Sequence, residues 1–477
     1  MRRVAAALAF LAPLCARGGL PPRYGGELTV ALAGPPSELD PARISDPAQI
    51  EAARAIHATL VEPGPGGQLR PGLLAALPEA EPGGRAFRLR LRPGLRFHDG
   101  RPVTAADVAA SLARLLSPSA RSLHGWVALP IAGADEVREG RATALSGAQV
   151  LGELELRVVL DAPFPDFPAA LAALPAAIVP RGAAGTGAGP FQLASRGPDG
   201  TLRLVAFDGH YRGRAYVDAV TLSGAEGRRA SRALGRGELD LALRPEAAPG
   251  TTPRDMPQVT ATYALVNPRR LGAAADELRR ALGALDRAEL ARLAGRGRVS
   301  PLASLLPPSI SPGGAAAVRG APGRIPGNPR VSLLVADGNR ALADRLQVKL
   351  FDRGVRAAVE AAPLSALAAR IASGSYDIAL ASLTFTSGSP QPALLEAAWA
   401  LGGPAVARRV LQRLGTADPA GVAGELAEEL GVVPLFVAGL RASARPGLSG
   451  LEVLPDATVD LAEIWLGARH PPAEGAR

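Results

Sequence analysis

The stretch LRPGLRFHDGRPVTAADV at residues 91–108 encodes two tight turns and the start of a helix. RPG at 92–94 and HDG at 98–100 combine residue types that favour turns, and only one short strand fits between them. Thr104 and Asp107 occupy the two positions of a capping box, in which a hydroxyl and a carboxylate satisfy the first free N–H groups of a helix. The stretch therefore predicts a turn, a strand, a second turn and a capped helix.

The sequence around this stretch indicates a mixed first half with strands and short helices. Residues 87–92 alternate strictly between apolar residues and arginines, so one face of this strand is expected to be buried. Related patterns predict strands at 27–33, 154–160, 202–207 and 217–222, and a helix at 50–61.

The second half changes character, because strands and helices alternate there. We expect strands at 331–336, 355–360 and 376–381, with helices at 341–352 and 364–373 between them. This order implies parallel strands with right-handed crossovers. Ligands of such sheets lie beyond the carboxyl ends of the strands, so the segments after Ala336 and after Ala381 are predicted to line a cleft.

Length and composition exclude several classes of protein. At roughly 150 residues per domain, 477 residues suggest two to four domains, and 47% apolar residues are typical of a globular chain. No run of 18 apolar residues follows the N-terminus, which excludes a multi-pass transporter or channel. The net charge of +9 comes from arginines spread along the whole chain, so we expect no nucleic-acid partner. An Arg-rich surface that binds nucleic acid or anionic lipid remains the alternative if folding gathers the arginines on one face.

The N-terminus has the pattern of a secretory signal. A basic start, an apolar run from Val4 to Leu14 and small residues thereafter predict a signal peptide at residues 1–18. We therefore expect the protein in the periplasm or on the exterior of the cell envelope. Cys15 is the only cysteine, so no disulfide framework is predicted. Lipid attachment at Cys15 stays open, although Leu14 is not the small residue that such sites prefer.

The chain shows no arrangement of residues that is typical of an enzyme. Its five histidines are scattered and have no metal-ligand spacing on a helix, and neither a Gly-x-Ser-x-Gly elbow nor a P-loop occurs. We predict no catalytic residue, no metal and no cofactor.

Several segments together resemble one known family. Residues 91–108 look like the signature of the family 5 extracellular solute-binding proteins, the oligopeptide-, dipeptide- and nickel-binding components of ABC importers. Further landmarks follow in that family's order: LDP at 39–41, GTGAGPF at 185–191, HYRGRAYVD at 210–218, GELD at 237–240, VN at 266–267, RRALGALDR at 279–287 and VPLF at 433–436. The likeness covers about residues 26 to 466.

The resemblance implies an α/β fold of the periplasmic-binding-protein type, with two lobes joined by two crossover strands and an extra inserted subdomain. It also implies a monomer that captures a small-molecule or peptide ligand between its lobes and delivers it to an ABC permease complex in the membrane. Mapped onto this sequence, lobe I is discontinuous (26–50, 175–260 and 435–470), the inserted subdomain is 51–174 and lobe II is 261–434.

One departure from the family pattern bears on the ligand. Peptide-binding relatives carry an aspartate, preceded by a tryptophan, shortly after the strand that corresponds to 376–381, and residues 382–392 here contain neither. A buried ammonium without a carboxylate partner is strongly disfavoured, so the departure argues against a peptide with a free terminal amine. We expect a small polar ligand, peptide-like or other. A solute-binding-like sensor or interaction protein that has lost transport is the alternative.

The candidate ligand contacts come from the sheet rule and the resemblance together. They are Thr384, Phe385, Thr386 and Ser387 after the last strand, Asn267 and Tyr263 at the crossover, and Ser37 and Glu38 after the first strand. For Phe385 and Tyr263, core packing is the alternative to ligand contact.

Overall fold

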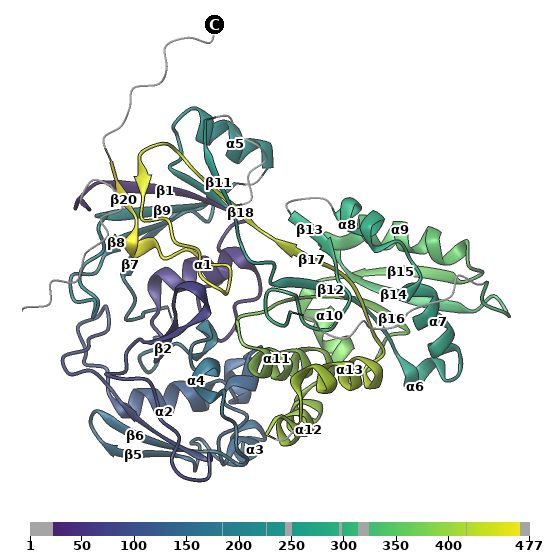
Figure 1. Cartoon of the computed structure of the whole chain (residues 1–477), viewed down its shortest axis with the longest axis horizontal. Helices are drawn as coiled ribbons and strands as arrows, with labels where there is room; N and C mark the ends of the chain where they lie inside the picture. Colours follow the sequence, from purple (N-terminus) through teal and green to yellow (C-terminus); the bar gives the residue numbers. More distant parts are fainter. Residues whose placement is uncertain are drawn as a thin grey trace, which may run out of the picture.

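The structure is a computed structural model of the chain. It describes residues 22–183, 185–225, 227–243, 250–294, 298–312, 324–415 and 417–467. The predicted signal peptide at 1–18, with Cys15, lies outside the described residues. Figure 1 shows two large sheets at opposite sides of the molecule and a smaller sheet below the first. Among the described helices, none is long and apolar enough to cross a membrane.

The first large sheet has seven strands in the order β11-β18-β10-β1-β9-β8-β7. We call the part of the chain built around it lobe I. Its strands are β1 (Glu27–Leu32), β7 (Phe191–Arg196), β8 (Leu202–Ala206), β9 (Ala219–Gly224), β10 (Leu241–Leu243), β11 (Thr252–Asp255) and β18 (Arg441–Ala444). Strand β1 lies parallel to both β9 and β10, so segments from three regions of the sequence meet in one sheet. Helices α1 (Pro47–Ile56) and α5 (Gly227–Gly235) and the short pair β19 (Leu448–Ser449) and β20 (Trp465–Leu466) accompany it.

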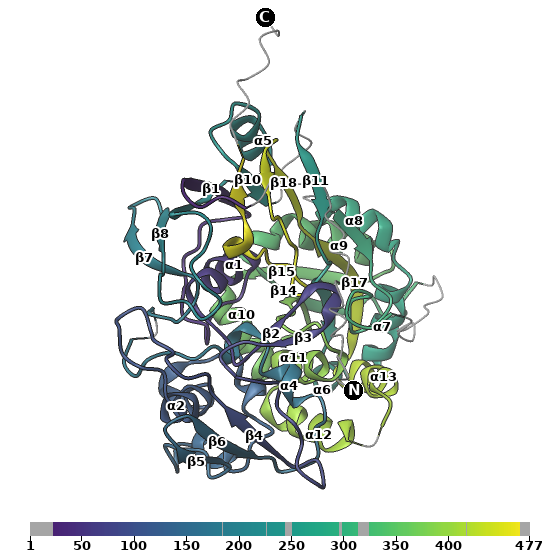
Figure 2. The same cartoon turned by 60° about the vertical axis from the view of Figure 1, so that its left-hand side comes forward.

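A smaller part, which we call the insert, contains residues 91–108 with their two turns and capped helix. Its sheet has the order β4-β6-β5, and the pair β2-β3 lies between it and lobe I (Figure 2). Its elements are β2 (Val61–Pro63), β3 (Leu69–Pro71), β4 (Ala86–Arg90), α2 (Ala105–Arg114), α3 (Ala134–Arg138), β5 (Ala148–Gly152), β6 (Glu155–Val159) and α4 (Phe167–Ala170). The predicted capping box is confirmed, because the Thr104 hydroxyl accepts from the Asp107 N–H and the Asp107 carboxylate accepts from the Thr104 N–H.

The second large sheet has six strands in the order β13-β17-β12-β16-β14-β15 and forms the core of lobe II. Its strands are β12 (Thr260–Val266), β13 (Arg298–Pro301), β14 (Arg330–Ala336), β15 (Arg356–Ala362), β16 (Ile378–Thr384) and β17 (Val432–Gly439). The predicted alternation of strands and helices is confirmed, since β14 lies parallel to both β15 and β16. Strand β16 continues three residues beyond the predicted end at Ala381, because it pairs with β12 as far as Thr384.

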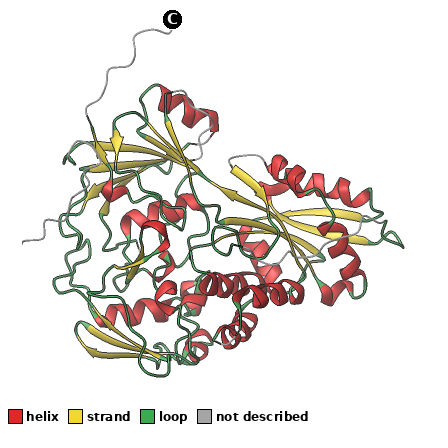
Figure 3. Cartoon of the chain, viewed as in Figure 1, coloured by secondary structure: helices red, strands yellow, loops and turns green. Residues whose placement is uncertain are grey.

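Helices cover both faces of the lobe II sheet (Figure 3). On one face, Leu333 and Val335 of β14 pack in a core cluster with α7 (Ala274–Gly283), α8 (Arg287–Ala294) and α9 (Arg340–Phe351). On the other face, Leu334 packs in a second cluster that includes α10, α11 and α13. The remaining helices of lobe II are α6 (Pro268–Leu271), α10 (Leu364–Ala372), α11 (Pro390–Gly402), α12 (Pro404–Leu414) and α13 (Pro419–Glu429).

Within the described residues, the chain passes between the two large sheets at two places. Strand β11 of lobe I leads into β12 of lobe II, and β17 of lobe II leads back into β18 of lobe I. The two passages lie side by side, because the Met256 N–H donates to the Leu440 carbonyl at 3.1 Å. The predicted pair of crossover strands is thus present.

Two predicted elements differ from the structure. The short strand expected between the turns at 92–94 and 98–100 is reduced to an isolated bridge between Arg96 and Pro102, and one helix is shorter than expected. The helix predicted at 50–61 begins at Pro47 and ends at Ile56, and Val61 already belongs to β2. The glycines at 187 and 189 explain the early end, since both lie against the last turn of this helix. The Gly189 N–H donates to the Ile56 carbonyl at 2.9 Å, where a continuing helix would place its own N–H.

Candidate functional site

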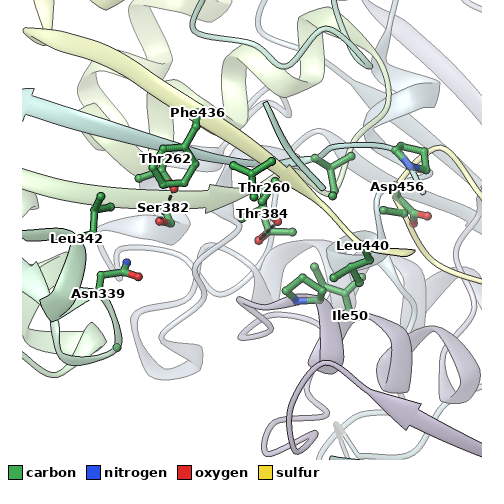
Figure 4. Close-up of a pocket in the computed structure, with 18 of the residues that line it drawn as sticks. Ile50, Thr260, Thr262, Asn339, Leu342, Ser382, Thr384, Phe436, Leu440 and Asp456 are labelled. Carbon is green, nitrogen blue, oxygen red and sulfur yellow. Dashed lines mark hydrogen bonds between the residues drawn. The ribbon is translucent and has the colours of Figure 1, made fainter. Parts of the chain in front are cut away.

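A cavity of about 670 Å³ lies beside the two crossovers, between lobe I and lobe II. Its volume falls within the range of about 300–1,000 Å³ that is usual for small-molecule sites. Figure 4 shows that side chains reach it from both lobes. The lining residues are Pro47, Ile50, Pro257, Val259, Thr260, Thr262, Val299, Gly338, Asn339, Ala341, Leu342, Ser382, Thr384, Phe436, Ala438, Gly439, Leu440, Asp456 and Ala457.

The lobe II wall of the cavity is the uncovered end of its sheet. Thr260 and Thr262 lie on the same face of β12 as Ala264 and Val266, since side chains of a strand alternate between faces. Ala264 and Val266 are covered by the cluster that contains α7, α8 and α9. Closer to lobe I, these helices no longer cover the sheet. The same face of β12 there carries the hydroxyl groups of Thr260 and Thr262.

Hydroxyl groups on this wall are paired across the two strands. Thr260 lies opposite Thr384, and their Oγ1 atoms are 3.1 Å apart; Thr262 lies opposite Ser382, with their hydroxyl oxygens 3.0 Å apart. Each pair shares one hydrogen, so the second hydroxyl hydrogen and the spare lone pairs of each pair stay free for a ligand. Figure 4 shows both pairs near the centre of the cavity.

Asp456 contributes a carboxylate to the lobe I side of the cavity. Its side chain is 4% exposed and forms an ion pair with Arg54. Its Oδ1 also accepts from the Thr458 hydroxyl at 2.6 Å. This carboxylate is therefore neutralised from the protein side of the cavity wall.

The residues predicted on the segment after β16 are divided by the structure. Thr384 lines the cavity, whereas Phe385 is fully buried in the large core cluster. Thr386 and Ser387 are each 3% exposed and lie at a separate small pocket next to Pro455. The Thr386 N–H and hydroxyl both donate to Glu396 of α11, the hydroxyl at 2.8 Å.

Glu396 is a buried carboxyl that holds this segment in place. It is 1% exposed, and burial raises its pKa to about 8 although the Thr386 hydrogen bonds lower it. His124 of the insert lies 3.9 Å away, and burial lowers its pKa to about 4. Near pH 7 both groups are mostly uncharged, so the contact between Glu396 and His124 is a neutral one.

The two candidates on the crossover strand serve the interior. Tyr263 is fully buried, and its hydroxyl donates to the Leu305 carbonyl at 2.5 Å. Asn267 caps α6, and its amide donates to the carbonyls of Gly374 and Tyr376. It also lies at the end of β12 far from Thr260, about 23 Å along a strand that rises about 3.3 Å per residue.

Ser37 and Glu38 lie in lobe I near α1 but not among the lining residues. The Ser37 hydroxyl accepts from the Gln49 amide at 3.1 Å. Glu38 accepts from the Leu39 and Asp40 N–H groups and forms an ion pair with Arg43. Both side chains thus organise the loop that precedes α1, while the helix itself sends Ile50 into the cavity.

Several lining residues were not among the candidates predicted from the sequence. Thr260 and Thr262 were detectable, because they are polar residues at alternate positions of an otherwise apolar strand, as are Ser382 and Thr384. Asn339 follows Ala336, so it lies on a segment predicted to line the cleft. Ile50, Phe436 and Leu440 have no local signal, since an apolar residue at a cavity has the same pattern as one in the core.

The described residues contain no group of three or more His, Cys, Asp or Glu side chains that could hold a metal ion. The arrangement at the cavity is suited to holding a molecule by hydrogen bonds and apolar contact.

Comparison with known proteins agrees with this arrangement. In sequence, the chain is 30% identical to the periplasmic murein peptide-binding protein MppA of Escherichia coli K12 over 144 residues, which are 30% of this chain and 26% of that protein. The alignment thus spans about a quarter of this curated relative's length.

Solved structures are matched over almost their whole length. The structure of the E. coli murein tripeptide binding protein MppA matches with a TM-score of 0.74 and 18% identity, covering 93% of this chain and 99% of that one. Haemophilus influenzae OppA in complex with RPPGFSPFR matches with a TM-score of 0.77 and 16% identity, covering 94% and 100%. At these identities the likeness shows a shared fold. The family described as bacterial extracellular solute-binding proteins, family 5 (middle region), matches residues 68–324, which is over half of the sequence. The chain therefore belongs to family 5 of the bacterial extracellular solute-binding proteins.

Proposed function

We propose that this protein captures a small polar ligand, peptide-like or other, in the cavity between its lobes and delivers it to an ABC importer. The observation that carries the proposal is a cavity of about 670 Å³ with walls from both lobes. Because a ligand there touches both walls at once, it binds the closed arrangement better than an open one, which is the condition for ligand-driven closure.

The crossovers connect binding to movement. Pro257, Val259 and Leu440 belong to the two passages between the sheets and also line the cavity. Residues that absorb a change of backbone angle are then in direct contact with the ligand. No covalent chemistry is required for this role, so we propose that the protein is not an enzyme.

The relatives support a peptide-like ligand and an exported protein. The E. coli relative is a murein peptide-binding protein by name, and H. influenzae OppA holds a peptide. By extension we propose an exported monomer in the periplasm or on the cell-envelope exterior, with a membrane permease as its partner. We also propose the predicted division into lobe I at 26–50, 175–260 and 435–470, the insert at 51–174 and lobe II at 261–434, with boundaries moved so that α1 stays whole in lobe I and β12 and β17 stay whole in lobe II.

Closure is testable by energy transfer between two labelled cysteines. In a Cys15→Ser background, Leu193→Cys on β7 and Phe351→Cys on α9 place one exposed label on each lobe. Ligands are first found by thermal shift with peptides, amino acids, sugars and metal chelates, since a ligand at 100 times its Kd stabilises by about 2.7 kcal/mol.

A ligand that raises the melting temperature is expected to bring the two labels closer. The control pair Phe351→Cys and Leu364→Cys lies within lobe II and is expected to show no change. A ligand that stabilises the protein but leaves the transfer between lobes unchanged would contradict capture by closure.

A further inference from the structure

The cavity wall differs in charge from the rest of the molecule. The sequence contains 53 basic and 44 acidic residues among 477, so a random set of lining residues of this size would include about two of each. Of the described residues that line the cavity, none is basic and only Asp456 is acidic. The described lining of the cavity is thus poorer in arginine than the sequence as a whole.

The one carboxylate in the wall is already paired. Arg54 forms an ion pair with Asp456, and the Thr458 N–H and hydroxyl donate to it. A ligand ammonium at this point would have to compete with a guanidinium that is itself only 13% exposed. Among the described residues that line the cavity, none therefore offers a free charge of either sign to a ligand.

Neutral hydrogen-bonding groups take the place of charges. The pairs Thr260–Thr384 and Thr262–Ser382 form a row of hydroxyls with free hydrogen-bonding capacity. Asn339 is the N-cap residue of α9, and its side chain forms no capping hydrogen bond to that helix. This side chain lies at the same cavity (Figure 4). Apolar side chains flank this row, with Phe436 and Leu342 on lobe II and Ile50 on lobe I.

We propose that the cavity selects an uncharged ligand whose amide or hydroxyl groups lie along the hydroxyl row, such as a peptide without free termini or a neutral glycan. This inference rests on the proposed function and narrows its ligand class. An unpaired ammonium or carboxylate would lose its hydration in the closed cavity without gaining a partner, which costs several kcal/mol. An amide or hydroxyl finds both donors and acceptors in the row.

The test compares a peptide that has charged termini with its blocked, uncharged form and with a neutral glycan. Trialanine with free termini, N-acetyl-trialanine amide and maltotriose are titrated by calorimetry and by the energy-transfer pair described above. We expect N-acetyl-trialanine amide or maltotriose to bind at least tenfold more tightly than free trialanine. Equal or tighter binding of free trialanine would overturn the inference, as would failure of both neutral probes to bind.

The two proposals fail in different ways. If a charged ligand closes the lobes and the neutral probes do not, the inference is overturned and capture by closure stands. If no ligand of any class closes the lobes, capture by closure is overturned as well.

Variants of the hydroxyl row locate the effect. Thr260→Val combined with Thr384→Val removes one pair at constant shape and leaves neither partner unsatisfied. Binding of the better neutral probe is expected to weaken by on the order of tenfold. Thr221→Val on β9, outside the cavity lining, is the matched control and is expected to leave binding unchanged.

A gain of function gives the complementary test. Ser382→Asp places a carboxylate in the row, opposite Thr262. The ratio of free trialanine binding to N-acetyl-trialanine amide binding is expected to rise at least tenfold. An unchanged ratio would show that the row does not face the ligand.

Discussion

Glu396 is a carboxyl group whose charge the fold disfavours. Burial raises its pKa to about 8, so the folded protein keeps this proton between about pH 4.5 and 8 while the unfolded chain releases it. Stability from this group is therefore present at low pH and is lost as the pH rises through this window. Glu51, buried in α1, contributes in the same direction, because its pKa is also raised to about 8.

Glu396→Gln is expected to remove part of the stability loss that accompanies rising pH. Between pH 6 and pH 9 the variant should lose about 1–3 kcal/mol less stability than the wild type, measured by denaturant unfolding at each pH. Glu428→Gln, an exposed glutamate of α13, is the control and should follow the wild type. A variant that loses stability as steeply as the wild type would mean that Glu396 is ionised in the folded protein at pH 7.

Residue 189 must be glycine because the backbone of Ile56 lies very close to it, and not because of its backbone dihedral angles. A Cβ atom there would lie 2.5 Å from the Ile56 carbonyl carbon, and backbone atoms cannot move aside as a flexible side chain could. Gly189→Ala is expected to destabilise the protein by about 1–3 kcal/mol, measured by thermal unfolding. At Gly185 in the same loop a Cβ atom meets nothing within 4 Å, so Gly185→Ala should be tolerated. Equal effects of the two changes would contradict this explanation.

Side chains at the cavity show what sequence can and cannot reveal. Thr384 was among the candidates because it follows a predicted strand, and its hydroxyl indeed lies at the cavity. Phe385, its neighbour, points to the opposite face and is buried, since a strand alternates and β16 continues to Thr384. The candidate ligand contacts thus depended on the predicted end of β16, and local sequence patterns predict the end of a strand with little precision. Ile50 and Leu440 come to the cavity only through the packing of one lobe on the other.

At the scale of elements, the strongest sequence signals were those with a local physical cause. The alternation of strands and helices from 331 to 381 was predicted because each element has its own period and its own stop. The order of strands in the sheets was not predicted. Strands β12 and β17, for example, are paired although their residues are far apart in the sequence. Such pairing leaves no local pattern.

The capping box at the start of α2 makes a prediction at this scale. Thr104→Ala removes the hydroxyl that accepts from the Asp107 N–H and is expected to cost about 1 kcal/mol of helix stability. The measurement is hydrogen exchange at the first turn of α2, because it reports on this helix end directly, and exchange there should become about fivefold faster. Thr143→Ala, at an exposed loop of the insert, should leave this exchange unchanged. Equal protection in wild type and Thr104→Ala would show that the cap does not hold the helix start.

For the whole molecule, the contact between lobe II and the insert bears on the proposed opening of the lobes. Helix α11 approaches so closely that a Cβ atom at Gly125 would lie 2.3 Å from the Trp399 ring. Arg408 of α12 reaches across to Asp135 at 2.9 Å and Asp161 at 2.8 Å. Opening the cavity by moving lobe II as a rigid body would have to break or slide this contact.

Arg408→Ala is therefore expected to favour the open arrangement. The guanidinium is 18% exposed but both carboxylates are 43% exposed, so solvent screening limits its contribution to about 1–2 kcal/mol. A change of that size shifts the ratio of open to closed molecules roughly 5- to 30-fold. Without ligand, small-angle scattering should show a larger radius of gyration, and the apparent ligand affinity should fall because part of the binding energy then goes into closure. The adjacent Arg409 pairs with Glu429 within lobe II, so Arg409→Ala should change neither quantity. If Arg408→Ala and Arg409→Ala scatter alike, the contact with the insert does not restrain the lobes.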